Sequence, residues 1–505
     1  MLLLTTTAIL ASTNPPNIMM IVADDLGFAD NSYTSDAGVA KTPNLDALAM
    51  AGLRLRNHHV QPVCSPTRAT LMTGRHVLRY GLQNTVIWPQ DAWALPQNET
   101  TLAQNLKDAG YRTAAFGKWH LGMHKRWALP RARGFDEQLG YYLGAEDYWT
   151  HAREGGIDWH YNDSTAEVKD NGTYSAHVLG AAASDFVIRH AGRPWFMYLA
   201  MQSVHSPLEA PEECLQRYPN LSGARRTRAA MVSALDDVVG NLSRVLQASR
   251  QADKTFILFT ADNGAPHGDA MWEGDDKRDA ITNAAQFQDA VRPPTGWGSP
   301  PHGGGGGSNY PYSGWKHWVF EGGVRSAAFV HWAPLNAQLG GKWHDGLFHS
   351  TDWLPTLVHL AGGHTTRNLP LDGFDLLTAL REGGVTSPRT ELPVNIAACG
   401  PDAKGVQSAI HGPQAAMIVG ELKLIVPCFW RSSRDLSAAQ LYNLSADVAE
   451  RHDLAATRPA DVARLAKRLA HWEALSVSPY AQDAIDASCG EGKAHGDPAA
   501  WSPWC

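Results

Sequence analysis

Two short apolar segments, far apart in the chain, each end in side chains that carry oxygen atoms. They are Ile18 to Val22, followed by Asp24 and Asp25, and Thr255 to Thr260, followed by Asp262 and Asn263. Short, continuous apolar runs are typical of strands that are buried on both faces of a parallel sheet. Because ligands of such sheets bind at the carboxyl ends of the strands, this pattern predicts an α/β fold with a polar site at that edge.

Helix-like segments alternate with strand-like segments between these two positions. Helices are expected at Thr42 to Gly52, Thr100 to Gly110 and Ala229 to Ala248, and further strands at Thr113 to Phe116 and Trp195 to Ala200. Such alternation predicts a doubly wound α/β domain built on a mostly parallel sheet. Because 505 residues exceed what one ordinary core holds, we expect this large domain, over residues 17–385, to be joined by a smaller one.

The last part of the chain predicts a smaller α+β domain over residues 386–505. The loop from Arg381 to Pro388 is rich in turn residues and marks the expected junction. Beyond it, Ala415 to Val419 and Leu422 to Val426 are apolar segments typical of the paired strands of a hairpin. Ala460 to Leu475 has the spacing of an amphipathic helix. We therefore expect a small antiparallel sheet with a closing helix.

One stretch differs in composition from the rest of the chain. Between Gly268 and Ser308 it contains two Pro-Pro pairs and the glycine run Gly303 to Gly307. This composition favours a long flexible loop over a helix or strand.

The charge pattern excludes one class of partner. The formal net charge is −7, and the lysines and arginines are scattered along the chain without forming a basic stripe, so we expect no nucleic-acid partner. No segment beyond the N-terminus approaches the roughly 20 apolar residues that span a bilayer, so no membrane span is expected either.

Several features predict export. Leu2 to Leu10 resembles the core of a signal peptide without its basic flank, so residues 1–16 are expected to be a truncated signal or leader. Four of the six cysteines lie in the last quarter of the chain, either in one or two disulfides or as reduced buried thiols. N-glycosylation sequons begin at Asn98, Asn162, Asn171, Asn220, Asn241 and Asn443. We therefore expect the secretory pathway, with a lysosomal or secreted destination.

The segment Cys64-Ser65-Pro66-Thr67-Arg68, followed by Leu71-Met72-Thr73-Gly74-Arg75, resembles the signature of the sulfatase family. A lone Cys-x-Pro-x-Arg is more often a buried cysteine beside a turn, but the second half favours the sulfatase interpretation. The resemblance implies an alkaline phosphatase-like fold, hydrolysis of sulfate esters, and conversion of Cys64 to formylglycine by a formylglycine-generating enzyme. The aldehyde hydrate can attack sulfur with one hydroxyl and expel sulfate by re-forming the aldehyde, whereas a serine would stay sulfated. Arg68, expected in the first helical turn, would hold the diol.

The polar residues after the two strands are candidate metal ligands. Asp24, Asp25, Asp262 and Asn263 offer hard oxygen donors without a thiol or imidazole at the same strand ends, a set that suits Ca²⁺ or Mg²⁺ better than zinc. One Asp-Asp pair alone is usually a solvated turn, but a second set after another strand favours a metal site. The resemblance implies one Ca²⁺, with the modified Cys64 as a further ligand, that polarises a sulfate oxygen and activates the attacking hydroxyl.

The remaining candidate residues follow from the resemblance alone. Lys118 and His120, in Gly117-Lys118-Trp119-His120, match the family's block for sulfate binding and for proton removal from the diol. His205, in Ser203-Val204-His205-Ser206-Pro207, would be the general acid beside the leaving oxygen. Lys316, in Gly314-Trp315-Lys316-His317-Trp318, would bind sulfate, and the segment Phe320 to Arg325 follows it at the family's position.

Further blocks resemble the arylsulfatase B branch, the N-acetylgalactosamine-4-sulfatases. Among them are Arg133 to Asp136, Gly144 to Tyr148, Pro207 to Glu212, Asp352 to Thr356 and Leu371 to Asp375. They imply a sulfated sugar or aryl sulfate as substrate, with N-acetylgalactosamine 4-sulfate ends the closest match. Residues 264–312 form a longer insertion than this branch has, beside the expected site mouth.

Two other functions stay open. A phosphatase or phosphonate monoester hydrolase of the same superfamily would share the sheet, but such phosphatases typically use Ser or Thr and two zinc ions. An inactive scaffold protein would normally have lost part of this residue set.

Overall fold

The structure is a computed structural model that describes residues 15–35, 39–165, 170–267, 305–384, 386–396, 414–427, 436–480, 488–489, 492–496 and 499–505. Three predictions therefore fall on residues that it does not describe. They concern the leader before residue 15, most of the loop between Gly268 and Ser308, and the state of Cys399 and Cys428.

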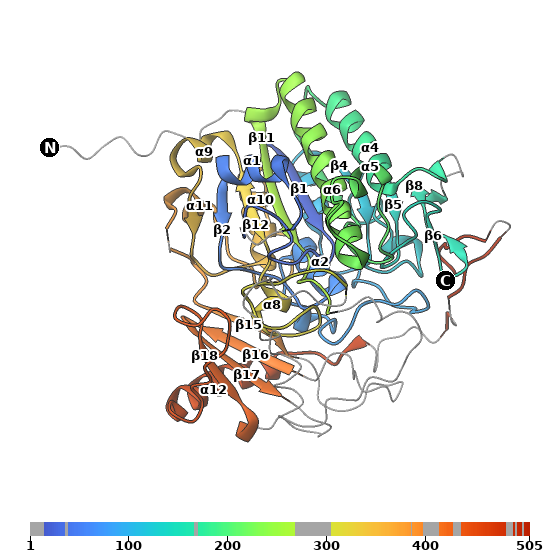
Figure 1. The fold of residues 1–505 in the computed structure, drawn as a ribbon. Coiled ribbons are helices and arrows are strands. Elements are labelled where there is room, and N and C mark those ends of the chain that lie inside the picture. Colours follow the sequence, from blue (N-terminus) through green and yellow to red (C-terminus); the bar gives the residue numbers. More distant parts are fainter. Residues whose placement is uncertain are drawn as a thin grey trace.

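A ten-stranded sheet forms the centre of the large domain (Figure 1), in the order β13-β2-β12-β11-β1-β10-β4-β5-β8-β9. The strands from β11 to β5 in this order are mutually parallel, and antiparallel pairs flank them on both sides. The bounds are β13 Trp343–His344, β2 Leu53–Leu55, β12 Ala328–His331, β11 Thr255–Ala261, β1 Asn17–Ala23, β10 Trp195–Ala200, β4 Arg112–Lys118, β5 Glu137–Tyr141, β8 His160–Tyr161 and β9 Ser164–Thr165. The predicted doubly wound, mostly parallel sheet is confirmed.

Side chains of β1 alternate between two cores, which explains why the strand is apolar throughout. Met19 and Ile21 pack with helices α1, α4 and α6 on one face, whereas Met20 and Val22 pack with α2, α3 and α10 on the other. Figure 1 shows α4 and α6 side by side over the first face. The helices are α1 Pro43–Ala51, α2 Cys64–Thr73, α3 Leu102–Asp108, α4 Ser175–Arg189, α5 Glu212–Leu215, α6 Gly223–Ala248, α8 Glu321–Val324, α9 Ala333–Leu339, α10 Trp353–Leu360 and α11 Leu377–Glu382.

A separate antiparallel sheet of four strands follows the large domain, as predicted. Its order is β15-β16-β17-β18, with bounds Glu391–Ile396, Gln414–Val419, Leu422–Pro427 and Gln440–Asn443. Helix α12, Pro459–Ala474, covers one face with Leu465 and Leu469, and residues around α8 of the large domain pack on the other. The small sheet therefore packs against its own helix on one face and against the segment that follows Lys316 on the other.

Buried charges lie where the small sheet meets the large domain. We call His59, Glu321, Arg325, Lys423 and Glu450 the Glu321 cluster. Lys423 Nζ on β17 lies 2.7 Å from Glu321 Oε1 and 2.8 Å from Glu450 Oε1, while His59 Nε2 lies 3.0 Å and Arg325 Nε 2.6 Å from Glu321 Oε2. Burial raises the pKa of Glu321, but Lys423, Arg325 and His59 outweigh it and hold this pKa well below its usual range.

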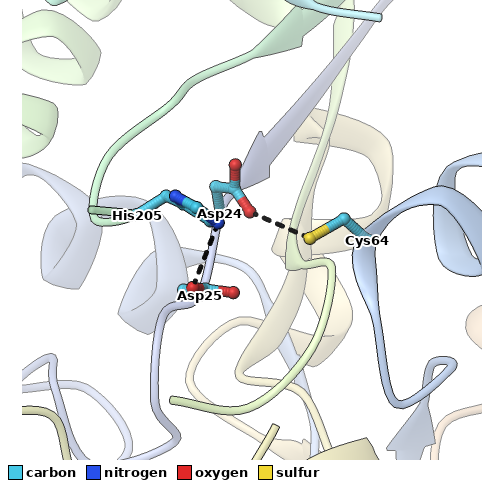
Figure 2. A group of neighbouring side chains, drawn as sticks. All are labelled: Asp24, Asp25, Cys64 and His205. Carbon is cyan, nitrogen blue, oxygen red and sulfur yellow. Dashed lines mark hydrogen bonds and ion pairs between the residues drawn. The ribbon is translucent and has the colours of Figure 1, made fainter. Parts of the chain in front are cut away.

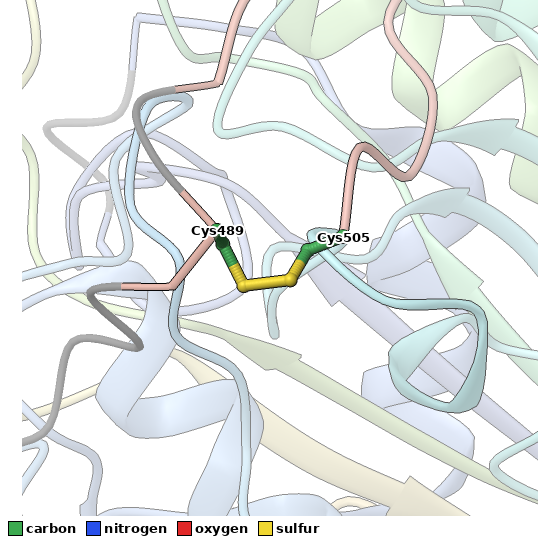
Figure 3. Close-up of a disulfide and its surroundings, with 2 residues drawn as sticks. All are labelled: Cys489 and Cys505. Carbon is green, nitrogen blue, oxygen red and sulfur yellow. A yellow bond between two sulfur atoms is a disulfide. The ribbon is translucent and has the colours of Figure 1, made fainter.

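The C-terminal segment is fastened to the large domain. Cys489 and Cys505 form a disulfide (Figure 3), one of the two states left open for the C-terminal cysteines. The backbone N–H groups of Trp504 and Cys505 donate to the carbonyl of His124, four residues after His120. Cys64 and Cys214 are free and buried. Among the described helices, none has the length and apolar character needed to cross a membrane.

Candidate active site

Four neighbouring strands deliver the predicted residues to one edge of the large sheet. Asp24 and Asp25 follow β1, Asp262 and Asn263 follow β11, His205 follows β10, and Lys118 ends β4. Backbone bonds hold these ends together: Asp24 N donates to Ser203 O at 2.9 Å and Asp262 N donates to Ala23 O at 3.0 Å. The parallel register therefore brings together residues that lie up to about half the chain apart in sequence.

Cys64 points into this edge from the first position of α2 (Figure 2). Its Sγ lies 3.6 Å from Asp24 Oδ1. Potential ligand atoms of Asp24, Asp25, Cys64 and His205 all lie within 4.8 Å of one another. Burial raises the pKa of the Cys64 thiol to about 12, against the effect of Lys118 and Lys316. The unmodified side chain is thus an uncharged thiol, not a thiolate nucleophile.

Three buried cations balance the three buried carboxylates of the site. The closest pairs are Lys118 Nζ with Asp24 Oδ2 at 2.6 Å, Lys316 Nζ with Asp25 Oδ1 at 2.7 Å, and Arg68 with Asp262 Oδ2 at 2.7 Å. Charges taken out of water need such partners, because leaving one buried ion unpaired costs on the order of several kcal/mol. Each buried carboxylate of the site therefore has the cationic partner that its burial requires.

Arg68 takes a somewhat different place from the one predicted. It opens the second turn of α2, one residue beyond the expected first turn. Its guanidinium donates to Asp262 Oδ2 through two nitrogens, and also to the Tyr198 hydroxyl and the Lys118 carbonyl. Arg68 therefore ties the strand ends of β4 and β11 together, 3.7 Å from the Asp24 carboxylate.

The oxygen donors fit a hard divalent cation. Asn263 Oδ1 is buried and has no hydrogen-bond partner among the described residues, while its Nδ2 donates to Asp25 Oδ1 at 2.7 Å. A buried carbonyl oxygen without a donor is costly, and a cation would satisfy it. Asp24 and Asp25 are buried beside it, so the donor chemistry is that of calcium or magnesium.

Hydrogen bonds assign the tautomers of both histidines. His120 Nε2 lies 3.0 Å from the Ile87 carbonyl and must donate to it, which leaves Nδ1 as a buried acceptor without a partner in the described part of the chain. His205 Nδ1 donates to Ser206 O at 2.7 Å, and its Nε2 lies 3.7 Å from Asp25 Oδ2. Burial, reinforced by Lys316, lowers the pKa of His205 to about 3.

Sequence reasoning missed two residues that support the Asp24-Asp25 loop and the segment that leads to Lys316. Arg228 on α6 donates to the backbone carbonyl of Asp25 and lies 3.4 Å from Asp30. Asn309 donates to the carbonyls of Ala265 and Gly314 and accepts from Ala265 N at 2.8 Å, which joins the two ends of the 264–312 segment. Arg228 stands in an arginine-rich stretch that looks like a solvated helix start, and Asn309 follows a glycine run, so neither carried a signal.

Comparison with known proteins identifies related chains. The family model described as Sulfatase matches residues 16–363. Arylsulfatase J of Mus musculus is 33% identical over 502 residues, which cover 92% of this chain and 77% of that protein. N-acetylgalactosamine-6-sulfatase of Homo sapiens is 31% identical over 390 residues, 73% of this chain and 66% of that protein.

Solved structures share the fold. A structure described as Ps i-CgsB in complex with k-i-k-neocarrahexaose matches with a TM-score of 0.75 and 25% identity, over 94% of this chain and 96% of that one. A phosphonate monoester hydrolase of Agrobacterium radiobacter has the same fold at a TM-score of 0.56 and 17% identity, over 91% of this chain and 95% of that one. Because the family model matches more than half of the chain, and arylsulfatase J is 33% identical over 92% of this chain and 77% of its own length, the chain belongs to the sulfatase family and is a sulfuric ester hydrolase.

Proposed function

We propose that this enzyme hydrolyses sulfate esters of carbohydrates, using formylglycine made from Cys64 and one Ca²⁺. The observation that carries the proposal is the convergence of Cys64 with Lys118, His205 and Lys316 on the Asp24-Asp25 pair. A plain thiol of raised pKa is a weak nucleophile, whereas a formylglycine hydrate offers one hydroxyl to attack sulfur and a second whose deprotonation expels sulfate.

The cations of the site would bind the sulfate group. The ammonium groups of Lys118 and Lys316 are buried and held 2.6 Å from Asp24 and 2.7 Å from Asp25, so each is fixed before substrate arrives. Preorganised charges of this kind stabilise the negative charge that develops on the sulfate oxygens. Arg68 acts behind them, since it holds Asp262 and the carbonyl of Lys118 in place.

The two histidines would handle protons on opposite sides of sulfur. His120 keeps Nδ1 unprotonated, because Nε2–H is committed to the Ile87 carbonyl, so Nδ1 can accept a proton from the residue at position 64. His205 presents Nε2 beside Asp25 because Nδ1–H is committed to Ser206. Nε2 must therefore gain a proton before it can protonate the leaving oxygen, and the negative charge of a bound sulfate ester would favour that imidazolium form.

Asp24, Asp25, Asp262 and Asn263 would hold the calcium ion, together with the modified residue 64. When bound, the ion would polarise a sulfate oxygen and lower the pKa of the attacking hydroxyl. The unpartnered Asn263 Oδ1 supports this assignment.

Calcium titration is expected to raise the unfolding temperature of the purified protein. A ligand that binds only the folded state adds about 2.7 kcal/mol of stability at a concentration of 100 Kd. Asp25→Asn should remove this shift, because it weakens a buried carboxylate ligand, whereas Asp237→Asn, an exposed carboxylate paired with Arg217, should keep it. Isothermal calorimetry with Ca²⁺ and Mg²⁺ measures binding directly. An unshifted wild-type protein that binds neither ion would contradict the proposed metal site.

The substrate is proposed from the branch resemblance and from carbohydrate names among the relatives. One relative is named for N-acetylgalactosamine 6-sulfate chemistry and one structure holds a neocarrahexaose. We expect terminal N-acetylgalactosamine 4-sulfate to be hydrolysed faster than a simple aryl sulfate, in an assay of sulfate release from a panel of sulfated mono- and disaccharides. A phosphate ester serves as the control for the phosphatase alternative. Equal or absent activity on the sugars would refute the substrate, and preference for the phosphate would refute the reaction.

Export and maturation follow from the same proposal. The Cys489–Cys505 disulfide supports a route through an oxidising compartment, with a lysosomal or secreted destination. Maturation there would require a formylglycine-generating enzyme as a transient partner.

A further inference from the structure

The segment Gly144 to Tyr148 contacts both histidines of the site, although the proposed chemistry assigns it no role. At Gly144, a side chain would approach His120 Nε2 to 2.9 Å, so only glycine lets the backbone pass this close to the ring. The same five residues reach the loop of His205 at their other end. The segment thus contacts both proton-transfer groups and can influence the position of each histidine ring.

Its link to the His205 loop begins with a reciprocal pair of hydrogen bonds. The side-chain amide of Gln202 accepts from Glu146 N at 3.1 Å and donates to Glu146 O at 2.6 Å. The backbone carbonyl of Gln202 in turn accepts from His205 N at 2.8 Å. All three residues are buried, so the loop cannot exchange these bonds for water.

Tyr148 makes the contact closest to the histidine itself. Its hydroxyl donates to the backbone carbonyl of His205 at 2.9 Å, and its side chain is fully buried. The Tyr148 ring stacks on Tyr174, with centroids 5.0 Å apart, and the backbone N–H of Tyr148 donates to Glu209 Oε2 at 3.0 Å. The hydroxyl is therefore held on a rigid support and meets the site at the backbone of His205.

We propose that Tyr148 is a positioning residue that sets the direction of the His205 ring. His205 already spends Nδ1–H on Ser206, so the position of its backbone decides where Nε2 points. Loss of the Tyr148 hydroxyl leaves a buried carbonyl without its donor and frees the loop to shift. The inference rests on the proposed function, because it takes His205 as the group that protonates the leaving oxygen.

The test compares two hydroxyl deletions on stacked rings. Tyr148→Phe removes the bond to His205 and keeps the ring. Tyr174→Phe is the matched control, because its hydroxyl donates to a backbone carbonyl in the same way, at 2.9 Å, but to that of Glu209. Each variant is assayed on a sulfated sugar, whose alcohol leaves poorly without a proton, and on nitrophenyl sulfate, whose phenolate leaves readily.

For Tyr148→Phe we expect kcat on the sulfated sugar to fall about tenfold, kcat on nitrophenyl sulfate to change less than about twofold, and KM to stay constant on both. A general loosening would lower both activities alike. Equal losses on the two esters, an unchanged sugar rate, or the same selective loss in Tyr174→Phe would overturn the inference alone. A wild-type enzyme that hydrolyses neither ester would overturn the proposed function and this inference with it.

Discussion

Replacing Cys64 with Ala is expected to lower kcat for sulfate esters by at least about 10⁴-fold, as removal of a covalent nucleophile does in other hydrolases. Cys64→Ser should support at most one turnover, because a sulfated serine has no second hydroxyl with which to expel sulfate. Both variants should fold, since within the described part of the chain the side chain at position 64 makes one weak hydrogen bond, at 3.6 Å to Asp24. Sulfate release, measured in the first turnover and at steady state, checks both expectations.

The chain contains its own control for this experiment. Cys214 is also free and buried, and it lies on α5, outside the site. Cys214→Ala should keep kcat close to that of the wild type. Mass analysis of the Cys64 peptide from active protein should show formylglycine in place of the thiol. An active Cys64→Ala variant, or active enzyme that carries only the thiol, would refute the mechanism.

Replacing Lys423 with Met is expected to lower the free energy of unfolding by about 3–5 kcal/mol, because it leaves buried carboxylates without their cation. Lys423 Nζ lies 2.7 Å from Glu321 and 2.8 Å from Glu450, and all three side chains are fully buried. The loss should appear as a lower urea midpoint at an unchanged m value. Because Glu321 belongs to the segment after Lys316, activity should fall as well.

Two further variants separate the charge effect from a general loss of a lysine. Lys467→Met replaces an exposed lysine of α12 in the same small domain and should change stability by less than about 0.5 kcal/mol. Burial raises the pKa of Glu450 to about 7, so Glu450→Gln in the Lys423→Met background should recover part of the lost stability. If the free energy of unfolding of Lys423→Met lies within about 1 kcal/mol of the wild-type value, the Glu321 cluster does not stabilise the contact between the two domains.

The central strands could be predicted from sequence because they are buried on both faces. The predicted segment Ile18 to Val22 lies within β1, Asn17–Ala23, and Thr255 to Thr260 lies within β11, Thr255–Ala261. Helix α6 begins at Gly223, before the predicted start at Ala229. The prediction misses the first turns because they contain the arginines that precede Arg228 and lack an apolar stripe. Amphipathic periodicity appears only where the helix packs on the sheet.

The site was only partly accessible to sequence reasoning. Strand ends and donor chemistry placed Asp24, Asp25 and Asp262 together, whereas Lys118, His205 and Lys316 came from family resemblance, since no spacing rule joins residues so far apart. The pairing of Arg68 with Asp262 and of Tyr148 with His205 depends on side-chain directions that emerge only in the folded chain. Sequence therefore predicts which residues converge, and the structure shows which of them hold the others.

Hydrogen bonds join the two ends of the 264–312 segment, so a change in its length need not reach the site. Asn309 joins Ala265 to Gly314, and Lys316 N donates to Ala265 O, so Asn263 and Lys316 are fixed by bonds below the insertion. Residues inserted or deleted between His267 and Gly305 need not disturb either side chain, because a change in chain length between two fixed ends costs little closure entropy. That interval is therefore the natural place to graft or randomise sequence in a search for altered selectivity, because the positions of Asn263 and Lys316 are kept.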